Sequence, residues 1–153
     1  MTRFSAASLR PVRAAVVLAG MLAACSGGYD VKKDGPLRVK DAWVRATNVT
    51  STAALYLTLE NRDTVAVMIV GAGTQFASAA EFHETMLVQG TSRMNRLDSL
   101  PIARGATLTM KPGGIHIMLI DLNASMAAGD SVALVMRLAD GRTTSVKAIA
   151  RDK

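Results

Sequence analysis

The sequence feature that most limits the possible folds is a series of short apolar segments, each closed by turn residues, without a long segment of helical periodicity. In residues 53–61, leucine at every second position alternates with aromatic or polar residues, which is the period of a strand with one buried face. Turn signals such as Lys111-Pro112-Gly113-Gly114 and Asp140-Gly141 separate the segments. This pattern predicts an all-β fold, an antiparallel sandwich or barrel of about eight to nine strands.

The individual strands can be placed from the same pattern. Hairpins are expected around Gln89-Gly90-Thr91 and around Asp140-Gly141. A single helical turn is expected at residues 78–82 or at residues 125–128. The expected strands span residues 37–47, 53–61, 65–70, 81–88, 92–97, 107–110, 115–122, 131–138 and 143–150.

The N-terminal segment has the features of an export signal and not of a folded domain. Arg3, Arg10 and Arg13 form a basic start, and an apolar run follows at residues 14–24. The 11 residues of this run are too few for the roughly 20 that a membrane-spanning helix needs. We therefore expect residues 1–24 to be a secretory signal peptide.

Cys25, the only cysteine, follows directly after this segment. Leu22-Ala23-Ala24-Cys25 resembles the bacterial lipobox, in which the signal is cut before the cysteine and the cysteine receives a lipid. Because Ser26 and not aspartate comes next, the pattern favours the outer membrane of a Gram-negative envelope, with the domain facing the periplasm. The alternative is an ordinary signal peptide with a cysteine near its cleavage site.

Processing before Cys25 would leave about 129 residues, the length of one domain, without a cysteine pair to form a disulfide. Residues 25–36 are expected to be a lipid-anchored flexible tether, and residues 37–153 the folded domain. Of the 18 basic residues, 15 remain against 12 acidic ones, a net charge of +3. Because there is no run of Lys or Arg, nucleic-acid binding is not expected.

The residues with metal-binding chemistry are two histidines, the only two in the chain, and the methionines near them. His116 and Met118 are two apart on an expected strand, so their side chains project from one face. His83 and Met94 lie on the two strands of an expected hairpin. Met86 is a further thioether close to His83, and the sequence leaves open whether it takes part.

Thioether and imidazole donors together favour Cu(I). Thioether sulfur is soft and uncharged, whereas Ca²⁺ and Mg²⁺ require oxygen ligands. Structural zinc sites and blue-copper centres use cysteine thiolate, which this set does not contain. The alternative is that the histidines and methionines pack in the core, as is expected of Met68, Met110, Met126 and Met136.

The spacing from His83 through Met94 and His116 to Met118 resembles the H-x10-M-x21-H-x-M pattern of the PCuAC family of periplasmic copper chaperones. Residues 41–47 and 54–61 are similar to the first two strands of that family. Residues 111–119, KPGGIHIML, are similar to its signature turn and strand. The similar segments extend over residues 39–150.

This resemblance implies a cupredoxin-like β-sandwich or Greek-key barrel with an exposed Cu(I) site formed by His83, Met94, His116 and Met118. It implies a chaperone that delivers copper to a copper-accepting protein, either a respiratory oxidase subunit or an assembly factor. Residues 149–153 lack the His- and Met-rich tail of some family members, so we expect one copper per chain. The domain is expected to be a monomer attached to the membrane through its N-terminal lipid.

An enzyme is not expected, because the sequence shows no nucleophile–base pair, no suggestive carboxylate pair, no phosphate loop and no CxxC motif. Three alternatives to copper delivery remain. A structural or interaction lipoprotein without metal would use the histidines and methionines in packing. A scavenging or resistance protein would bind copper without passing it to an oxidase. A redox-active copper protein would hold Cu(II) stably and cycle between the two oxidation states.

Overall fold

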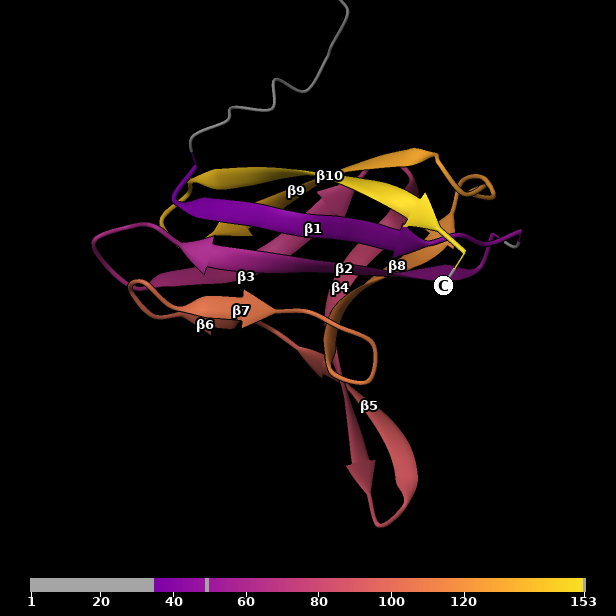
Figure 1. Ribbon diagram of the computed structural model, residues 1–153, viewed down its shortest axis with the longest axis horizontal. Helices are drawn as coiled ribbons and strands as arrows, with labels where there is room; N and C mark the ends of the chain where they lie inside the picture. The colour runs from indigo at the N-terminus through magenta and orange to yellow at the C-terminus, as the bar shows by residue number, and fades with distance from the viewer. Residues whose placement is uncertain (1–34, 49, 153) are drawn as a thin grey trace, which may run out of the picture.

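The computed structural model describes residues 35–48 and 50–152, and this part of the chain is an all-β domain (Figure 1). The expected signal peptide, the lipidation site Cys25 and nearly all of the expected tether lie outside the described residues. None of the described segments is a helix long and apolar enough to cross a membrane. The described strands are β1 (Leu37–Arg45), β2 (Thr52–Asn61), β3 (Val67–Thr74), β4 (Ala77–Val88), β5 (Thr91–Leu97), β6 (Leu100–Ile102), β7 (Thr107–Thr109), β8 (Ile115–Leu122), β9 (Ser131–Leu138) and β10 (Thr143–Arg151).

Seven of these strands close into a barrel. Hydrogen bonds join them in the order β4, β8, β2, β1, β10, β9 and β3, and β3 pairs with β4 to complete the circle. Neighbouring strands are antiparallel except β1 and β10, which run parallel, whereas the sequence predicted antiparallel pairs throughout. β5 continues the sheet beyond β4, and the short strands β6 and β7 pair with β3 and β2.

The interior of the barrel holds the hydrophobic core. Leu55, Leu57 and Leu59 of β2 are at most 1% exposed, as their period of two predicts. Ile117 and Leu119 of β8 face them from the neighbouring strand and are fully buried. The residues that lie between these buried ones on each strand point away from the core. We call the outward-facing residues of the seven barrel strands the outer wall.

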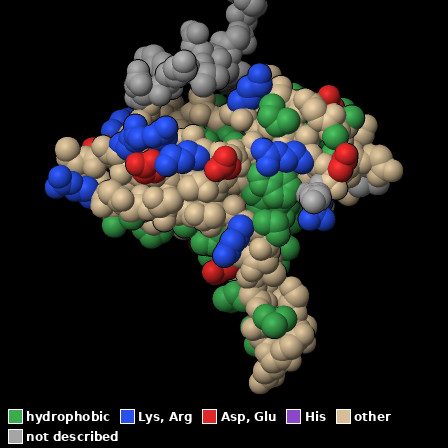
Figure 2. Space-filling view, in the orientation of Figure 1, with side chains coloured by type: hydrophobic (Ala, Val, Ile, Leu, Met, Phe, Trp, Pro, Cys, Tyr) green, Lys and Arg blue, Asp and Glu red, His purple; other side chains and the backbone are tan. Residues whose placement is uncertain are grey.

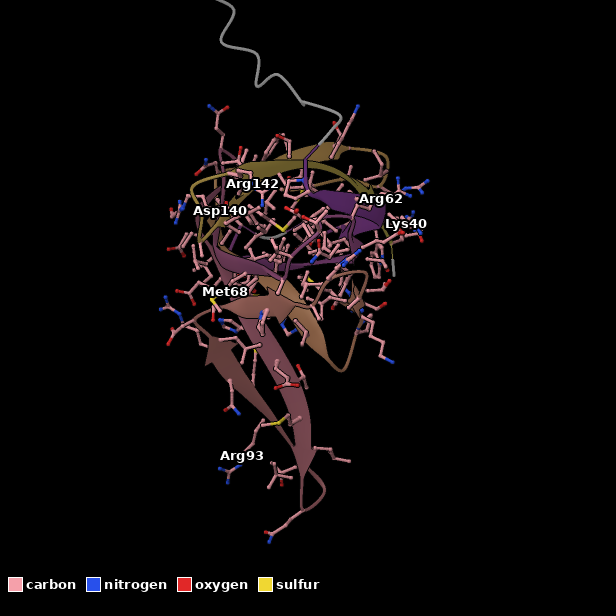
Figure 3. The ribbon with its side chains drawn as sticks, turned by 90° about the vertical axis from the view of Figure 1, so that its left-hand side faces the viewer. Lys40, Arg62, Met68, Arg93, Asp140 and Arg142 are labelled. Carbon is pink, nitrogen blue, oxygen red and sulfur yellow. The ribbon has the colours of Figure 1, made fainter. Side chains whose placement is uncertain are left out.

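The structure corrects three details of the expected fold. Residues 78–82 belong to β4 and not to a helical turn, and residues 125–128 contain a β-bridge from Met126 to Thr47. The strand β6 was not expected, because its three residues are too short to show a period and include a proline. Met110, Met126 and Met136 are buried as expected, but Met68 occupies an outward position of β3 and is 45% exposed (Figure 3).

A β-bulge in β1 decides which of its side chains reach the outer wall. Lys40 pairs with Thr58 and Trp43 pairs with Tyr56, so three steps along β1 match two steps along β2. Asp41 has a positive φ of 51°, a conformation that aspartate adopts more readily than most residues. Without the extra residue, Trp43 would point into the core.

The β4–β5 hairpin extends beyond the barrel as an arm, which we define as residues 86–95 (Figure 1). All of its side chains are exposed, with Leu87 at 76%, and Arg93 lies far out along it (Figure 3). At its base, the Thr85 amide donates a hydrogen bond to the Gly114 carbonyl at 3.1 Å. The expected hairpin is thus present, but beyond Glu84 its strand β4 pairs only with β5 and no longer with the barrel strand β8.

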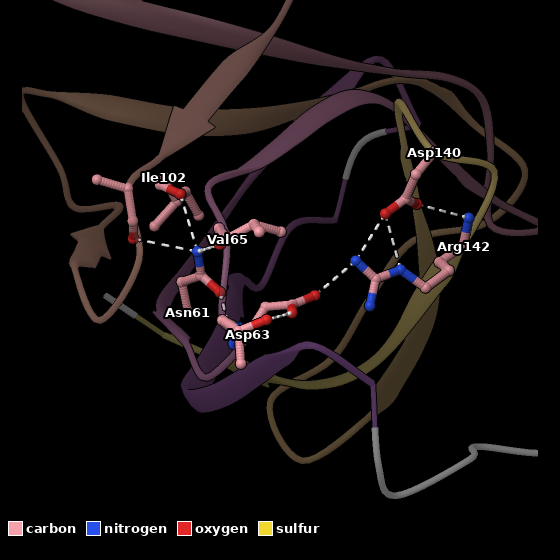
Figure 4. A network of polar contacts seen from close by, with 8 residues as sticks. Asn61, Asp63, Val65, Ile102, Asp140 and Arg142 are labelled. Carbon is pink, nitrogen blue, oxygen red and sulfur yellow. Dashed lines mark hydrogen bonds and ion pairs between the residues drawn. The ribbon is translucent and has the colours of Figure 1, made fainter.

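A buried asparagine connects β2 to the loop beside β6 (Figure 4). Asn61 is 1% exposed, and its amide nitrogen donates to the carbonyls of Val65, Ile102 and Ala103 at 2.9, 2.9 and 3.1 Å. Its side-chain oxygen accepts from the Asp63 amide at 2.8 Å. Without this side chain, each of these backbone groups would lose a hydrogen bond, although the Ala103 carbonyl would still accept one from the Ala106 amide at 3.0 Å.

Replacing Asn61 with alanine is therefore expected to lower the free energy of unfolding by about 2–3 kcal/mol, because buried carbonyls would lose their donor. Urea denaturation followed by circular dichroism measures this change. Asn95→Ala on the exposed arm is the matched control and should change the free energy by about 0.5 kcal/mol or less. Equal effects of the two substitutions would show that Asn61 has no special role in stability.

Close to Asn61, one guanidinium joins two carboxylates (Figure 4). Nη2 of Arg142 lies 2.6 Å from Asp63 and 2.6 Å from Asp140. Hydrogen bonds from Arg142 are the main reason why the pKa values of both carboxyls lie below their ordinary value of 3.8. A carboxyl with a lowered pKa stabilises the fold above its unfolded pKa, and this contribution is lost as the pH falls through the folded pKa.

We expect Arg142→Gln to lower the thermal midpoint at pH 7 by a small amount, because Arg142 and Asp140 are exposed to solvent and only Asp63 is partly buried. The difference from the parent should shrink as the pH falls below 3.8, the ordinary pKa of aspartate, and vanish once both carboxyls are protonated in the folded state. Thermal unfolding followed at a series of pH values tests this. Arg104→Gln, which removes an exposed arginine elsewhere, should show no such trend, and a difference independent of pH would contradict the assignment.

Candidate metal centre on the outer wall

The two histidines face each other across β4 and β8. His83 pairs directly with His116, and the centroids of the two rings are 6.0 Å apart. Directly opposite residues of antiparallel strands project to the same side of the sheet. Because the adjacent residues Phe82 and Ile117 point into the core at 3% and 0% exposure, both imidazoles lie on the outer wall.

Met118 lies on the same wall. It follows His116 by two residues on β8 and pairs with Glu81, which precedes His83 by two residues on β4. Its side chain is partly buried. The structure therefore brings three of the four predicted ligands onto one part of the outer wall.

Met94 lies on the other side of the histidine pair. It pairs with Thr85 on the arm and is 50% exposed. This register places its side chain on the same face of the hairpin as His83. On a flat sheet, Met94 and Met118 would be two inter-strand spacings apart across the sheet and four residues apart along it. Their β-carbons would then be separated by about 17 Å. A single ion could be shared by both sulfurs only if the arm curves toward the outer wall.

Met86 lies on the opposite face of the arm. It is three residues from His83 along a strand and pairs with Arg93. Since side chains alternate between the two faces of a strand, its thioether points away from the face that carries the histidines. The register therefore distinguishes Met94 from Met86, which the sequence alone did not do.

A backbone carbonyl orients the His116 ring. Nδ1 of His116 lies 3.0 Å from the Gly114 carbonyl oxygen. A carbonyl can only accept a hydrogen bond, so Nδ1 carries the proton, and in the neutral ring Nε2 has the lone pair. This is the usual arrangement for a histidine that binds a metal through its other nitrogen.

A carboxylate orients the His83 ring through the other ring nitrogen, Nε2, and not through Nδ1 as in His116. Nε2 of His83 lies 3.0 Å from Oε2 of Glu81, so Nε2 donates and Nδ1 of the neutral ring has the lone pair. Among the described residues, nothing forms a hydrogen bond to this buried Nδ1 atom. A buried nitrogen without a partner is uncommon in folded proteins, and a metal ion would satisfy it.

Sequence reasoning did not identify Glu81. Its carboxylate also contacts Nη1 of Arg96 at 3.1 Å. The hydrogen bond from His83 lowers the pKa of Glu81 most, and the charge of Arg96 adds to this, while partial desolvation acts against it. The signal in the sequence was the two-residue spacing from Glu81 to His83, which puts both side chains on one face of a strand.

A row of four aromatic rings crosses the outer wall from β1 to β4. The centroid distances are 4.5 Å from Trp43 to Tyr56, 6.1 Å from Tyr56 to His116 and 6.0 Å from His116 to His83. Tyr56 and His116 are only 7% and 4% exposed although they face outward. Trp43 and Tyr56 thus flank the histidines and restrict the position of the His116 ring.

No group of three or more His, Cys, Asp or Glu side chains comes together within residues 35–48 and 50–152 to hold a metal ion. The uncharged donors near the two imidazoles are the thioether of Met118 on this wall and the thioether of Met94 on the arm, while the nearby Glu81 carboxylate is paired with His83 and Arg96. This donor set matches the preference of Cu(I) and not that of zinc or of an oxygen-binding ion.

Comparison with protein families identifies relatives over almost the whole domain. The family model described as "Putative lipoprotein LpqE-like" matches residues 37–150. The chain is 33% identical over 151 residues to the "Putative lipoprotein Lxx21020" of Leifsonia xyli subsp. xyli (strain CTCB07). That alignment covers 94% of this chain and 90% of the relative.

Solved structures with the same fold include the copper-bound PCuAC domain from PmoF2, with a TM-score of 0.64 and 19% identity over 78% of this chain and 95% of that one. The solution structure of apo-DR1885 from Deinococcus radiodurans has a TM-score of 0.58 and 28% identity, covering 100% of this chain and 97% of that one. The Cu(I) form of DR1885 is 26% identical, with a TM-score of 0.52, over 82% of this chain and 86% of that one. The expected PCuAC resemblance and cupredoxin-like fold are confirmed.

The two hydrogen bonds predict different tautomers for the two histidines in the metal-free protein. With both rings neutral, His83 should carry its proton on Nε2 and His116 on Nδ1. Long-range ¹H–¹⁵N correlation spectra of the imidazoles distinguish the tautomers. Glu81→Gln should loosen the tautomer preference of His83 and leave that of His116 unchanged. A single common tautomer in both rings of the parent would contradict this arrangement.

Proposed function

The chain belongs to the LpqE-like family, and from this premise we propose that it is a Cu(I)-binding chaperone of the bacterial cell envelope. The observation that carries the proposal is the orientation of the two imidazoles. Nδ1 of His83 and Nε2 of His116 are each left with a lone pair by a hydrogen bond at the other ring nitrogen. The likeness to DR1885, which was also solved in its Cu(I) form, supports this function.

In the proposed site, one Cu(I) ion per chain binds the two imidazole nitrogens and the sulfurs of Met118 and Met94. The soft, uncharged sulfurs favour the reduced ion over Cu(II). Because none of the four ligands is negatively charged, the charge of the ion is not neutralised, and the ion can be exchanged. Met118 comes from the barrel, and Met94 would reach the ion through curvature of the arm.

The proposed role is to pass copper on. The ion would lie on the outer wall, where a copper-accepting protein can replace the ligands one at a time. A respiratory oxidase subunit or an assembly factor is the proposed recipient. We propose a binding protein and not an enzyme, acting as a monomer.

The proposed location is the envelope, with the domain held by a lipid. The family and the relative are described as lipoproteins, which supports lipidation of Cys25 after removal of residues 1–24. Residues 25–36 would then act as a tether between the lipid and the domain at residues 37–153. The serine after Cys25 favours the outer membrane, facing the periplasm.

Anaerobic titration with Cu(I) against a chromophoric chelator tests the copper site. The parent should bind one equivalent. Met118→Leu should weaken binding by about tenfold or more, since changes around metal ligands have effects of this size. Met94→Leu should have a smaller effect because its side chain lies on the exposed arm, and the double substitution should abolish tight binding. Met68→Leu, an exposed methionine on β3, is the control and should bind like the parent.

The alternatives give different results in the same titration. No stoichiometric binding, or binding that survives both methionine substitutions, would favour an interaction lipoprotein without metal. Stable Cu(II) binding with reversible cycling at the same residues would favour a redox protein. Tight Cu(I) binding without transfer to any copper-accepting protein would favour scavenging or resistance.

A further inference from the structure

Beside Met118, the outer wall contains a pocket of about 440 Å³. Its lining includes Met118 and Tyr56, the turn residues Pro112 and Gly113, and Arg45 at the end of β1. Figure 2 shows hydrophobic side chains gathered over the ends of β1 and β2 above the arm, with Lys or Arg side chains next to them. The pocket therefore adjoins the proposed copper site on the side away from the arm.

Arg45 lines this pocket, and Arg151 and Lys111 are direct neighbours of its lining residues. We define these three cations as the cationic rim. Arg45 and Arg151 pair directly in the parallel ladder of β1 and β10. The guanidinium of Arg151 lies 5.9 Å from the centroid of the Trp43 ring. Lys111 is exposed and immediately precedes Pro112 of the pocket lining.

The cationic rim has no internal counter-ion in the described part of the chain. The ion pairs found there involve other cations, namely Lys40, Arg62, His83, Arg96 and Arg142. Asp152 follows Arg151 and lines a neighbouring pocket, which shares Ala46 and Thr47 with this one, but none of the ion pairs in the described residues joins it to the rim. Arg45 and Arg151 are paired neighbours on adjacent strands, so their like charges repel, and the contact of Arg151 with the Trp43 ring offsets only part of this repulsion. An anionic partner would remove the repulsion.

We propose that the pocket and its cationic rim form the docking surface for a copper-accepting protein whose own copper ligands are flanked by acidic side chains. This inference rests on the proposed function. The acidic groups would pair with Arg45, Arg151 and Lys111, and the pocket would give an incoming ligand a path to the ion beside Met118. Complementary charge of this kind acts mainly by speeding the encounter and selecting the partner.

Copper transfer to two synthetic peptides tests the proposal. The peptides carry the same methionine-based Cu(I) ligands, flanked by Glu in one and by Lys in the other. The protein loaded with Cu(I) should transfer copper to the Glu-flanked peptide about tenfold faster at low salt. The difference should disappear at about 0.5 M salt because the charges are then screened. Stopped-flow absorbance with a chelator reporting residual copper measures both rates.

The variant Arg45→Gln/Arg151→Gln should lose most of the preference for the Glu-flanked peptide while its Cu(I) affinity in the chelator titration stays unchanged. The control variant Arg104→Gln/Arg137→Gln removes the same charge from exposed positions elsewhere and should keep the preference. Equal rates for the two peptides, or the same loss in both variants, would overturn the docking surface. Absence of Cu(I) binding by the parent would instead overturn the proposed function, and with it this inference.

Discussion

The alternation of side chains along the strands of a closed barrel is the constraint on which the rest of this structure depends. Closure leaves the seven strands no free edge among themselves, so each strand has one face in the core and one on the outer wall. Ile117 fills the core, while His116 and Met118 on either side of it face outward. Packing of the core residues between them thereby holds the candidate ligands in position on the outer wall.

The local hydrogen bonds then give these ligands their chemistry. The Gly114 carbonyl and the Glu81 carboxylate each accept a hydrogen bond from one ring nitrogen, which leaves a lone pair on the other nitrogen of His116 and of His83 to bind a metal. The barrel fixes the distance between the rings, and the arm places Met94 where solvent or a partner can reach it. A rigid base with one exposed candidate ligand is consistent with the exchange of the ion proposed above.

Much of this could be predicted from the sequence because the relevant signals are local. The period of two in β2, the turn at Asp140-Gly141 and the two-residue spacing from His116 to Met118 all depend on neighbours in the chain. The short strand β6 could not be found in this way, since it forms only by pairing with β3. The positions of Glu81 and Met86 relative to His83 follow from alternation along the strand already expected at residues 81–88, but only the structure showed the contact between Glu81 and His83.

The sequence by itself determined the all-β class, the hairpin that carries His83 and Met94, and the donor types that favour Cu(I), because these follow from residue chemistry and short-range spacing. Only the tertiary structure decided the long-range register. It set His83 opposite His116, used the bulge at Asp41 to turn Trp43 outward, and placed Arg45 beside Arg151 through a parallel pair. These juxtapositions join residues 13 to 106 positions apart, and they exist only because the closing of the barrel selects one register for each strand pair.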